Sequence, residues 1–273
     1  MVFTKKRLAD FFEKEKIEYF SVIPYASCTV KRADIMARES FLPRSVIVML
    51  VPYYGITVRN FSVYAASCDY HIYIRELTDR LAQYLHCEFP SANCKGYGDH
   101  SPIDERHAAL VCGLGVLGDN RLLINEKYGS YVFIAEMITD IDPELLGADS
   151  PIEISHCIGC GECKRACATG ILTDSSKDCL SAITQKKGEL SPIEASLMRK
   201  NNTVWGCDKC QSVCPYNRNP KESPIPFFKE NLISELTEDV ILDMSDEDFS
   251  RRAFSWRGKK TVLRNIEILK GKE

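Results

Sequence analysis

Thirteen cysteines in 273 residues constrain this chain more than any other feature. Eight of them lie between positions 157 and 214, beginning with the run Cys157-x-x-Cys160-x-x-Cys163-x-x-x-Cys167. In bacterial ferredoxins this spacing lets three thiolates bind one iron-sulfur cluster while the fourth binds a neighbouring cluster. A second run, Cys207-x-x-Cys210-x-x-x-Cys214-Pro215, follows, and Cys179 lies between the two runs. Eight thiolates are the number that two 4Fe-4S clusters require.

The ferredoxin arrangement also predicts how these cysteines divide between the clusters. One cluster takes Cys157, Cys160, Cys163 and the distant Cys214, and the other takes Cys167, Cys179, Cys207 and Cys210. Two structural zinc sites are the alternative, because paired Cys-x-x-Cys motifs also suit tetrahedral zinc, although the unbroken three-plus-one run is not the usual zinc spacing. The other five cysteines have no metal-binding spacing, and we expect them to pack among buried apolar side chains: Cys28, Cys68, Cys87, Cys94 and Cys112.

Composition places the chain among ordinary folded proteins. It has 45% hydrophobic and 27% charged residues, which excludes disordered and collagen-like classes. No apolar run reaches the roughly 18 residues of a membrane-spanning helix, and the charged N-terminus is not that of a signal peptide, so we expect a cytoplasmic protein without membrane contact. In that reducing compartment thiolates bind metal more often than they form disulfides. The net charge of -3 gives no general attraction for nucleic acid, so any such contact needs a local basic patch.

Hydrophobic periodicity predicts three parts. Residues 1–150 alternate strand-like apolar runs, at 19–23, 45–51 and 131–138, with helical spacing between 64 and 85, which is typical of an α/β domain. Ser101 followed by Pro102 predicts the start of a helix that ends before Gly113. Residues 151–220 form the double-cluster, ferredoxin-like domain, and residues 221–273 form a C-terminal extension with a basic tail.

A glycine run and one acidic residue are the further candidates in the first domain. Gly113-Leu114-Gly115-Val116-Leu117-Gly118 matches the dinucleotide-binding fingerprint by letters, but a helix precedes it where a strand is required. The glycines therefore indicate a tight backbone turn, which would leave room for a flat ligand, rather than a Rossmann site. Asp99 lies in a loop before Ser101, and it is either a catalytic acid or a solvated turn aspartate.

The order of motifs along the chain resembles that of the epoxyqueuosine reductase family. The motifs, besides the two cysteine runs, are Ser62-x-Tyr64-Ala65, Asp69-Tyr70-His71, Asp99-x-x-Pro102-x-x-Glu105-Arg106, Gly113-Leu114-Gly115-x-x-Gly118-x-Asn120 and Gly129-Ser130-Tyr131-Val132-Phe133. The similarity reaches Trp256-Arg257-Gly258-Lys259-Lys260, which in the family leads into an array of helical repeats. Because the sequence stops there, we expect a short form without the repeats.

The resemblance implies an oxidoreductase with two 4Fe-4S clusters and a base-off cobalamin between the α/β domain and the cluster domain, the cofactor pairing of reductive dehalogenases. Such enzymes reduce epoxyqueuosine in a tRNA anticodon loop to queuosine. By position, Asp99 matches the proton-donating aspartate. The residues that the resemblance places around the corrin and substrate are Tyr64, Asp69, His71, Arg106, Gly113, Gly115, Gly118 and Asn120. Where a histidine-ligated cobalamin motif would need glycine the chain has Ile74, so no protein histidine is expected on cobalt.

Partners and substrate are less constrained by the sequence. The resemblance implies an external electron donor of the flavodoxin or ferredoxin type. The family usually has arginine where Val63 stands and lysine where Asp119 stands, which leaves open a related cobalamin reductase acting on a small molecule, or a ferredoxin-type protein without corrin. The candidate tRNA contact is the basic run Arg251, Arg252, Arg257, Lys259, Lys260 and Arg264, with Phe254 and Trp256 between. The alternative is a solvated tail whose aromatics pack on the domain.

Overall fold

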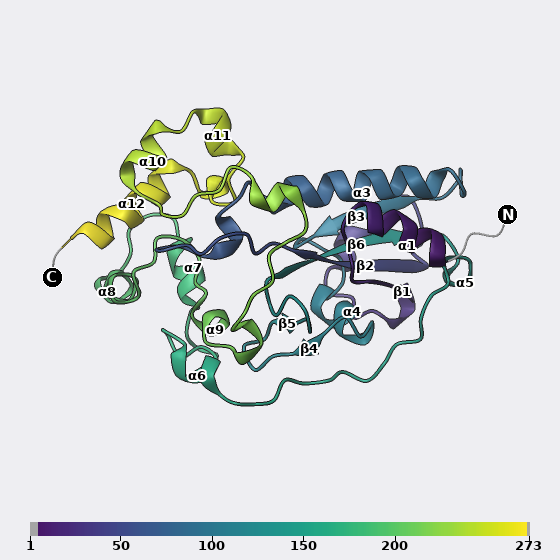
Figure 1. The fold of residues 1–273 in the computed structure, drawn as a ribbon, viewed down its shortest axis with the longest axis horizontal. Coiled ribbons are helices and arrows are strands. Elements are labelled where there is room, and N and C mark those ends of the chain that lie inside the picture. The colour runs from purple at the N-terminus through teal and green to yellow at the C-terminus, as the bar shows by residue number, and fades with distance from the viewer. Residues whose placement is uncertain (1–4, 272–273) are drawn as a thin grey trace. The chain divides into compact units, whose positions relative to one another are not determined.

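The computed structural model describes residues 5–271, and the chain forms two compact units (Figure 1). The first unit contains residues 5–52 and 71–158, and the second contains residues 53–70 and 159–271. Residues 53–70 thus belong with the C-terminal half of the chain. The boundaries expected from the sequence, at 150 and 220, remain a prediction. Among the described residues, no helix is both long and apolar enough to cross a membrane.

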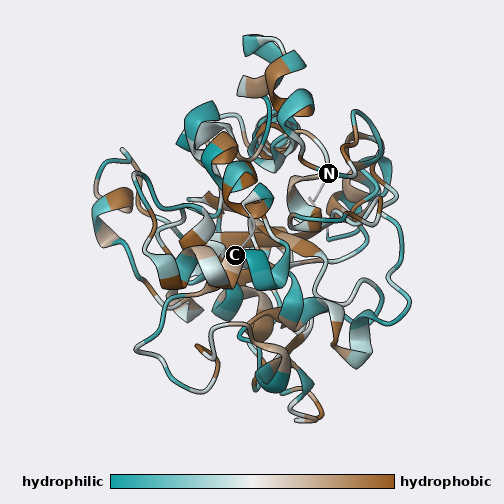
Figure 2. Ribbon diagram, turned by 90° about the vertical axis from the view of Figure 1, so that its left-hand side faces the viewer, coloured by the Kyte–Doolittle hydropathy of each residue, from teal (hydrophilic) through white to brown (hydrophobic). Residues whose placement is uncertain are grey.

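A four-stranded sheet forms the centre of the first unit. Its order is β1-β2-β6-β3, and every pairing is antiparallel. The strands are β1 (Phe20–Pro24), β2 (Ser45–Pro52), β6 (Val132–Thr139) and β3 (Cys94–Gly98). All eight residues of β2 are buried, as its continuous apolar composition predicts. Figure 2 shows hydrophobic strand segments, in brown, near the centre of the ribbon.

Helices cover both faces of this sheet. Figure 1 shows α1 (Lys5–Lys14) and α3 (Tyr70–His86) on one face and α4 (Glu105–Val111) on the other. The long helix α3 buries a stripe at helical spacing: Tyr73, Ile74, Leu77, Leu81 and Leu85. The same unit contains η1 (Tyr25–Ser27), α2 (Ala33–Met36), α5 (Pro143–Leu146), and a two-stranded hairpin of β4 (Val116–Leu117) and β5 (Leu123–Ile124).

Two glycines bring α3 close to the edge strand β3. A Cβ atom at Gly96 would lie 2.2 Å from Thr78 Oγ1, and one at Gly98 would lie 2.8 Å from Ile74 Cδ1. Any side chain at Gly96 would therefore displace the helix. This packing fixes the end of β3, from which the Asp99 turn begins.

The predicted start of α4 is wrong by three residues, because the helix begins at Glu105 and not at Pro102. Asp104 is the N-cap, and its carboxylate accepts the backbone N–H of His107 at 3.2 Å. Pro102 O instead accepts backbone N–H bonds from Lys31 and Arg32, both at 2.9 Å. Tertiary pairing of this extended segment therefore overrides the local capping signal. The predicted end is confirmed, since Gly113 has a φ of +71°.

The second unit is made of short helices around an aromatic core. Trp205 and Phe254 are fully buried there, and their rings pack edge to face at 6.2 Å. Its elements are η2 (Val63–Ala65), α6 (Glu162–Ala166), α7 (Leu180–Thr184), α8 (Pro192–Asn201), α9 (Lys209–Ser212), η3 (Pro215–Asn217), η4 (Pro226–Lys229), α10 (Glu238–Asp243), α11 (Asp246–Ser250), η5 (Ser255–Arg257) and α12 (Lys259–Lys270).

The buried Asn60 joins residues 53–70 to this unit by hydrogen bonds. The Asn60 side chain donates to Leu236 O and accepts the Leu236 N–H, both at 2.9 Å. The Asn60 carbonyl also accepts the Val204 N–H at 2.6 Å. Because each bond satisfies a buried polar group, the segment is held by the C-terminal half of the chain.

The five cysteines outside the runs differ in exposure. Cys68 is buried, and Cys28, Cys94 and Cys112 are half-buried, with Cys28 and Cys112 against the core under α4. The expectation of burial is wrong for Cys87, which is exposed just after the C-terminus of α3. Cys87 lies in the turn that follows α3, beyond Leu85, the last buried residue of that helix.

Candidate functional site

Asp99 occupies a strained turn directly after β3. Its φ is +70°, in the left-handed region that costs a non-glycine residue about 1 kcal/mol. Its side chain is 68% exposed, and Oδ2 lies 3.9 Å from Nε2 of His71. Two sequence-predicted residues from separate motifs are therefore brought together. An exposed carboxyl beside an imidazole, held in an unfavourable backbone conformation, is an arrangement suited to proton transfer.

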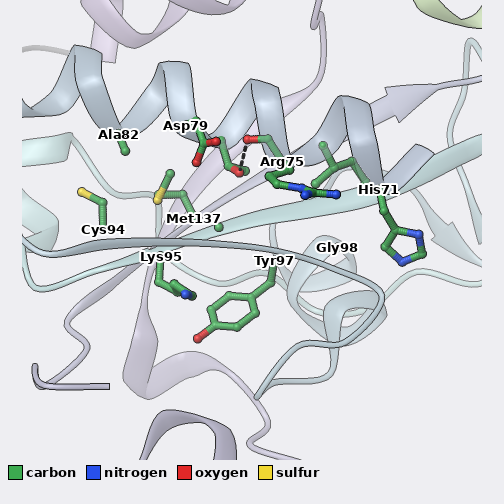
Figure 3. Close-up of a pocket in the computed structure, with 12 residues that line it drawn as sticks. His71, Arg75, Asp79, Ala82, Cys94, Lys95, Tyr97, Gly98 and Met137 are labelled. Carbon is green, nitrogen blue, oxygen red and sulfur yellow. Dashed lines mark hydrogen bonds between the residues drawn. The ribbon is translucent and has the colours of Figure 1, made fainter. Parts of the chain in front are cut away.

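A half-open cavity of about 560 Å³ lies on the surface along α3 and β3, and His71 is part of its lining. Figure 3 shows His71 at one end of it, near Gly98, and Cys94 at the other. Arg75 and Lys95 supply positive charge to the lining, and Asp79 supplies one negative charge. The volume is in the range of small-molecule sites. The sequence did not predict this cavity, because it depends on how a helix packs against a sheet edge.

Two carboxyl groups, that of the buried Glu136 and that of the half-buried Glu105, lie behind the Asp99 turn. The hydroxyl of Ser101 donates a short hydrogen bond to Oε2 of Glu136, which lies on β6 and is 1% exposed. Burial raises the pKa of Glu136 to about 8. Burial and the charge of Asp99 raise the pKa of Glu105 to about 7. Sequence reasoning missed this group, although Glu136 is the single charged residue within the apolar run 131–138.

The glycine run forms the β4–β5 hairpin. A Cβ atom at Gly115 would lie 2.5 Å from the Ile124 carbonyl oxygen, and one at Gly118 would lie 2.3 Å from Asn120 Oδ1. Gly113 ends the preceding helix with positive φ. A hairpin after a helix is not the strand–turn–helix of a dinucleotide site, in agreement with the order of elements predicted from sequence.

Arg106 and Asn120 also belong to this region. The Arg106 guanidinium donates to the Arg121 carbonyl at 2.7 Å, which fixes the side chain against the hairpin turn. Asn120 is buried, and its Oδ1 accepts the Leu122 N–H at 3.2 Å. Its Nδ2 has no hydrogen-bond partner among the described residues, so it is a buried donor that a bound molecule would satisfy.

The hairpin also holds the first cysteine of the cluster run. The Cys157 N–H donates to Leu117 O at 3.0 Å, and the Asp119 N–H donates to Cys157 Sγ at 3.3 Å. His156 pairs with Leu117 as an extended bridge. A backbone N–H bond to sulfur stabilises a thiolate, as is usual around cluster ligands.

Cys210 interacts electrostatically with three other cysteines of the second unit. Burial, together with electrostatic repulsion from Cys207, Cys179 and Cys167, raises the pKa of the Cys210 thiol to about 12. These four are the set expected for one cluster. The pKa of Cys167, in contrast, is lowered. Burial raises it, but hydrogen bonds from the backbone N–H groups of Leu172, Thr169 and Gly170 outweigh the effect of burial.

The remaining expected ligands are Cys157, Cys160, Cys163 and Cys214. Cys163 and Cys214 are buried in the second unit, Cys160 is exposed, and Cys157 lies at the end of the first unit. Within residues 5–271, no three His, Cys, Asp or Glu side chains converge closely enough to hold a single metal ion. Thiolates in this number and spacing fit the chemistry of iron-sulfur cubanes.

Tyr64 and Asp69 belong to the second unit. The Tyr64 hydroxyl accepts the indole N–H of the buried Trp205 at 2.8 Å. The Asp69 N–H donates to Arg251 O at 2.7 Å. Both residues are therefore built into the packing of residues 53–70 on the C-terminal half of the chain.

The basic C-terminal run is not a tail, because it continues as helix α12. Arg252 is buried and donates to Asn231 O at 2.6 Å. Lys259 Nζ donates to Met244 O and to the Asp246 carboxylate, both at 3.0 Å. Arg264 donates to Lys186 O at 2.8 Å. Phe254 is buried too, whereas Trp256 is 57% exposed with the Arg257 guanidinium 3.8 Å from its ring centre. Packing therefore occupies half of the expected phosphate contacts and leaves Arg251, Arg257 and Lys260.

Comparison with known proteins identifies the cluster-binding segment and the family. Residues 156–217 match the model of the 4Fe-4S double cluster binding domain. The epoxyqueuosine reductase of Staphylococcus aureus is 32% identical over 285 residues, which cover 94% of this chain and 73% of that protein. The chain belongs to the epoxyqueuosine reductase family. It therefore carries a domain that binds two 4Fe-4S clusters, as the cysteine count predicts.

Further relatives support the same family and fold. The epoxyqueuosine reductase of Bacillus cereus is 34% identical over 211 residues, which cover 72% of this chain and 53% of that protein. The chain spans about half the length of several such relatives. An epoxyqueuosine reductase solved with an epoxyqueuosine-modified tRNA stem loop superposes with a TM-score of 0.79 at 24% identity, covering 97% of this chain and 80% of that one. The expected fold class, an α/β domain followed by a ferredoxin-like double-cluster domain, is confirmed.

Proposed function

We propose that this protein is a cobalamin- and iron-sulfur-dependent oxidoreductase that reduces epoxyqueuosine in tRNA to queuosine. The observation that carries the proposal is the Asp99–His71 pair, exposed beside a cavity, in a family member with a double-cluster domain. Relatives bearing the name epoxyqueuosine reductase match this chain in sequence and fold, and one of them was solved with the modified stem loop.

The residues of the first unit fit a corrin. A corrin carries amide side chains, which accept hydrogen bonds, and the buried Asn120 Nδ2 lacks an acceptor among the described residues. Gly118 lies beside that amide, and Arg106 donates to the Arg121 carbonyl of the same turn. When bound, cobalamin supplies the low-potential cobalt that delivers electrons to the epoxide carbon.

Asp99 acts as the general acid. Converting an epoxide to an alkene breaks two C–O bonds, consumes two electrons and two protons, and releases the oxygen as water. The Asp99 carboxyl gives a proton to that oxygen, and the His71 imidazole, 3.9 Å away, is close enough for an ion pair with the carboxylate that remains. Because the Asp99 side chain is 68% exposed, solvent supplies the second proton and recharges the acid.

The eight cysteines hold the electron path. Cys167, Cys179, Cys207 and Cys210 bind one cluster, and Cys157, Cys160, Cys163 and Cys214 bind the other. The electrostatic interaction of Cys210 with Cys207, Cys179 and Cys167 supports this division. A cytoplasmic flavodoxin or ferredoxin would reduce the clusters one electron at a time.

The tRNA contact uses only part of the basic run, namely the cations that packing does not engage. Arg251 and Lys260 are exposed, and Trp256 presents an aromatic face with Arg257 stacked on it. Cations beside an exposed aromatic ring suit a phosphate backbone with an unpaired base. Because three of the six cations are engaged in packing, a small-molecule substrate is the second candidate.

The test is turnover by anaerobically reconstituted protein with cobalamin, a chemical reductant and epoxyqueuosine-containing tRNA. We expect queuosine to form, and Asp99→Asn to reduce turnover by about 100-fold or more while cobalamin still binds. Near-normal turnover in Asp99→Asn would move the acid to His100 or water. Unreduced tRNA with active, cluster-loaded and cobalamin-loaded protein would favour the small-molecule reductase.

A further inference from the structure

Two carboxyl groups behind the Asp99 turn have no part in the reaction described so far. Glu136 lies on β6, between β2 and β3, and Glu105 is the first residue of α4. One oxygen of each, Glu136 Oε1 and Glu105 Oε2, is buried without a hydrogen-bond partner among the described residues. Buried polar atoms without partners are rare and destabilising, so two of them side by side require a specific explanation.

Both carboxyl groups are attached to the turn that carries Asp99. The Ser101 hydroxyl donates to Glu136 Oε2, and the Glu105 carboxyl interacts electrostatically with Asp99. Within the turn, the Ser101 N–H donates to Asp99 O at 3.1 Å. The third residue of the turn is therefore hydrogen-bonded to one acid, and the first residue interacts electrostatically with the other.

The surroundings of this pair are short of positive charge. Glu136 interacts with Glu105 and Asp104, and the other titratable groups that interact with it are Tyr25, Cys28, Tyr97 and Cys112. Glu105 interacts with Asp99, Asp104 and one cation, Arg106. Two ionised carboxylates at these positions would repel each other in a medium of low dielectric constant. The arrangement is stable only while the pair retains a proton.

We propose that Glu105 and Glu136 are positioning residues that hold the Asp99 turn at the sheet edge, and that ionisation of both loosens the turn. The proposal rests on the proposed function only for the role of Asp99 as the acid. A left-handed aspartate persists only where its surroundings fix it, and here the fixing contacts are these two acids. The pKa values of about 7 and about 8 place the loss of the last proton just above neutral pH.

The test is amide hydrogen exchange of the segment 98–104, measured from pH 6 to pH 9 and corrected for intrinsic exchange rates. We expect protection of this segment to fall by about tenfold or more across that range in the wild type. Glu105→Gln and Glu136→Gln keep the shape and an acceptor oxygen but cannot ionise, so their protection should stay constant. Glu13→Gln, at an exposed position on α1, is the matched control and should follow the wild type.

Two results would overturn the positioning role: constant protection in the wild type, or the same fall in both glutamine variants. Turnover gives a second readout that a merely structural role would not move. The alkaline limb of the kcat profile should shift upward in Glu136→Gln, with KM unchanged. Asp99→Asn separates the two proposals, because its loss or retention of turnover tests the general acid, whereas exchange in the segment 98–104 tests the anchoring.

Discussion

The backbone N–H of Asp119 donates to Sγ of Cys157 at 3.3 Å, so the glycine hairpin and the first cysteine of the cluster run form one structural element. The hairpin needs glycine for its own packing, because a Cβ at Gly115 would lie 2.5 Å from the Ile124 carbonyl oxygen. Damage to the hairpin should therefore reach the cluster, even though no glycine side chain can bind iron.

Gly115→Ala tests this coupling. Since the obstructing atom is backbone and cannot move aside alone, we expect a loss of about 1–3 kcal/mol in the free energy of unfolding. Iron content after anaerobic reconstitution should fall as Cys157 loses its position. Gly271→Ala is the control, because its added Cβ would have no neighbour closer than 3.7 Å. Full iron content together with wild-type stability in Gly115→Ala would contradict the coupling.

The cluster assignment makes a quantitative prediction about iron. Cys210→Ser removes the thiolate that interacts with Cys167, Cys179 and Cys207, so reconstituted protein should hold about four irons rather than about eight. Cys163→Ser should remove the other cluster to a similar extent. Cys87→Ser is the matched control, because this exposed cysteine lies outside both runs. Zinc in place of iron in the wild type would reject both assignments.

Cysteine spacing and strand composition carried most of what could be predicted. The run 45–51 is apolar at every position but one and became the buried strand β2, and the eight-cysteine pattern matched a double-cluster domain. What failed depended on tertiary contacts. Ser101 has the local signals of a helix cap, but its hydroxyl binds Glu136, which is 35 residues away in sequence. No local pattern contains that information.

The same limit applies to the functional sites. The basic run was predicted as one surface, yet Arg252 and Arg264 donate to backbone carbonyls and are partly or fully buried. Sequence gives the charge of a residue but not which carbonyl groups compete for it. Likewise, the Asp99–His71 pair joins motifs 28 residues apart in sequence, and the packing of α3 on β3 at Gly96 brings them within 3.9 Å.

Stability should fall as the pH rises, because of Glu136. Burial raises the pKa of its carboxyl from 4.5 to about 8, so between these values the folded state binds a proton that the unfolded state does not. The free energy of unfolding should therefore decrease by up to about 1.4 kcal/mol per pH unit across that range, and level off above it. Glu136→Gln should flatten the slope in denaturant titrations between pH 5 and 8. An equal slope in that variant and in Glu13→Gln would rule out Glu136 as its source.

Binding to tRNA should depend on the exposed cations of the C-terminal region and not on those engaged in packing. Arg251 and Lys260 are exposed, so Arg251→Glu with Lys260→Glu should weaken binding and make its salt dependence shallower by about two in slope. Cluster and cobalamin spectra should not change, because neither side chain supports the core. Lys6→Glu with Lys14→Glu makes the same change in net charge on helix α1 and should leave affinity nearly unaltered. If both double variants lose affinity equally, the contact is a general charge effect, and the exposed Trp256 surface has no special role in recognising tRNA.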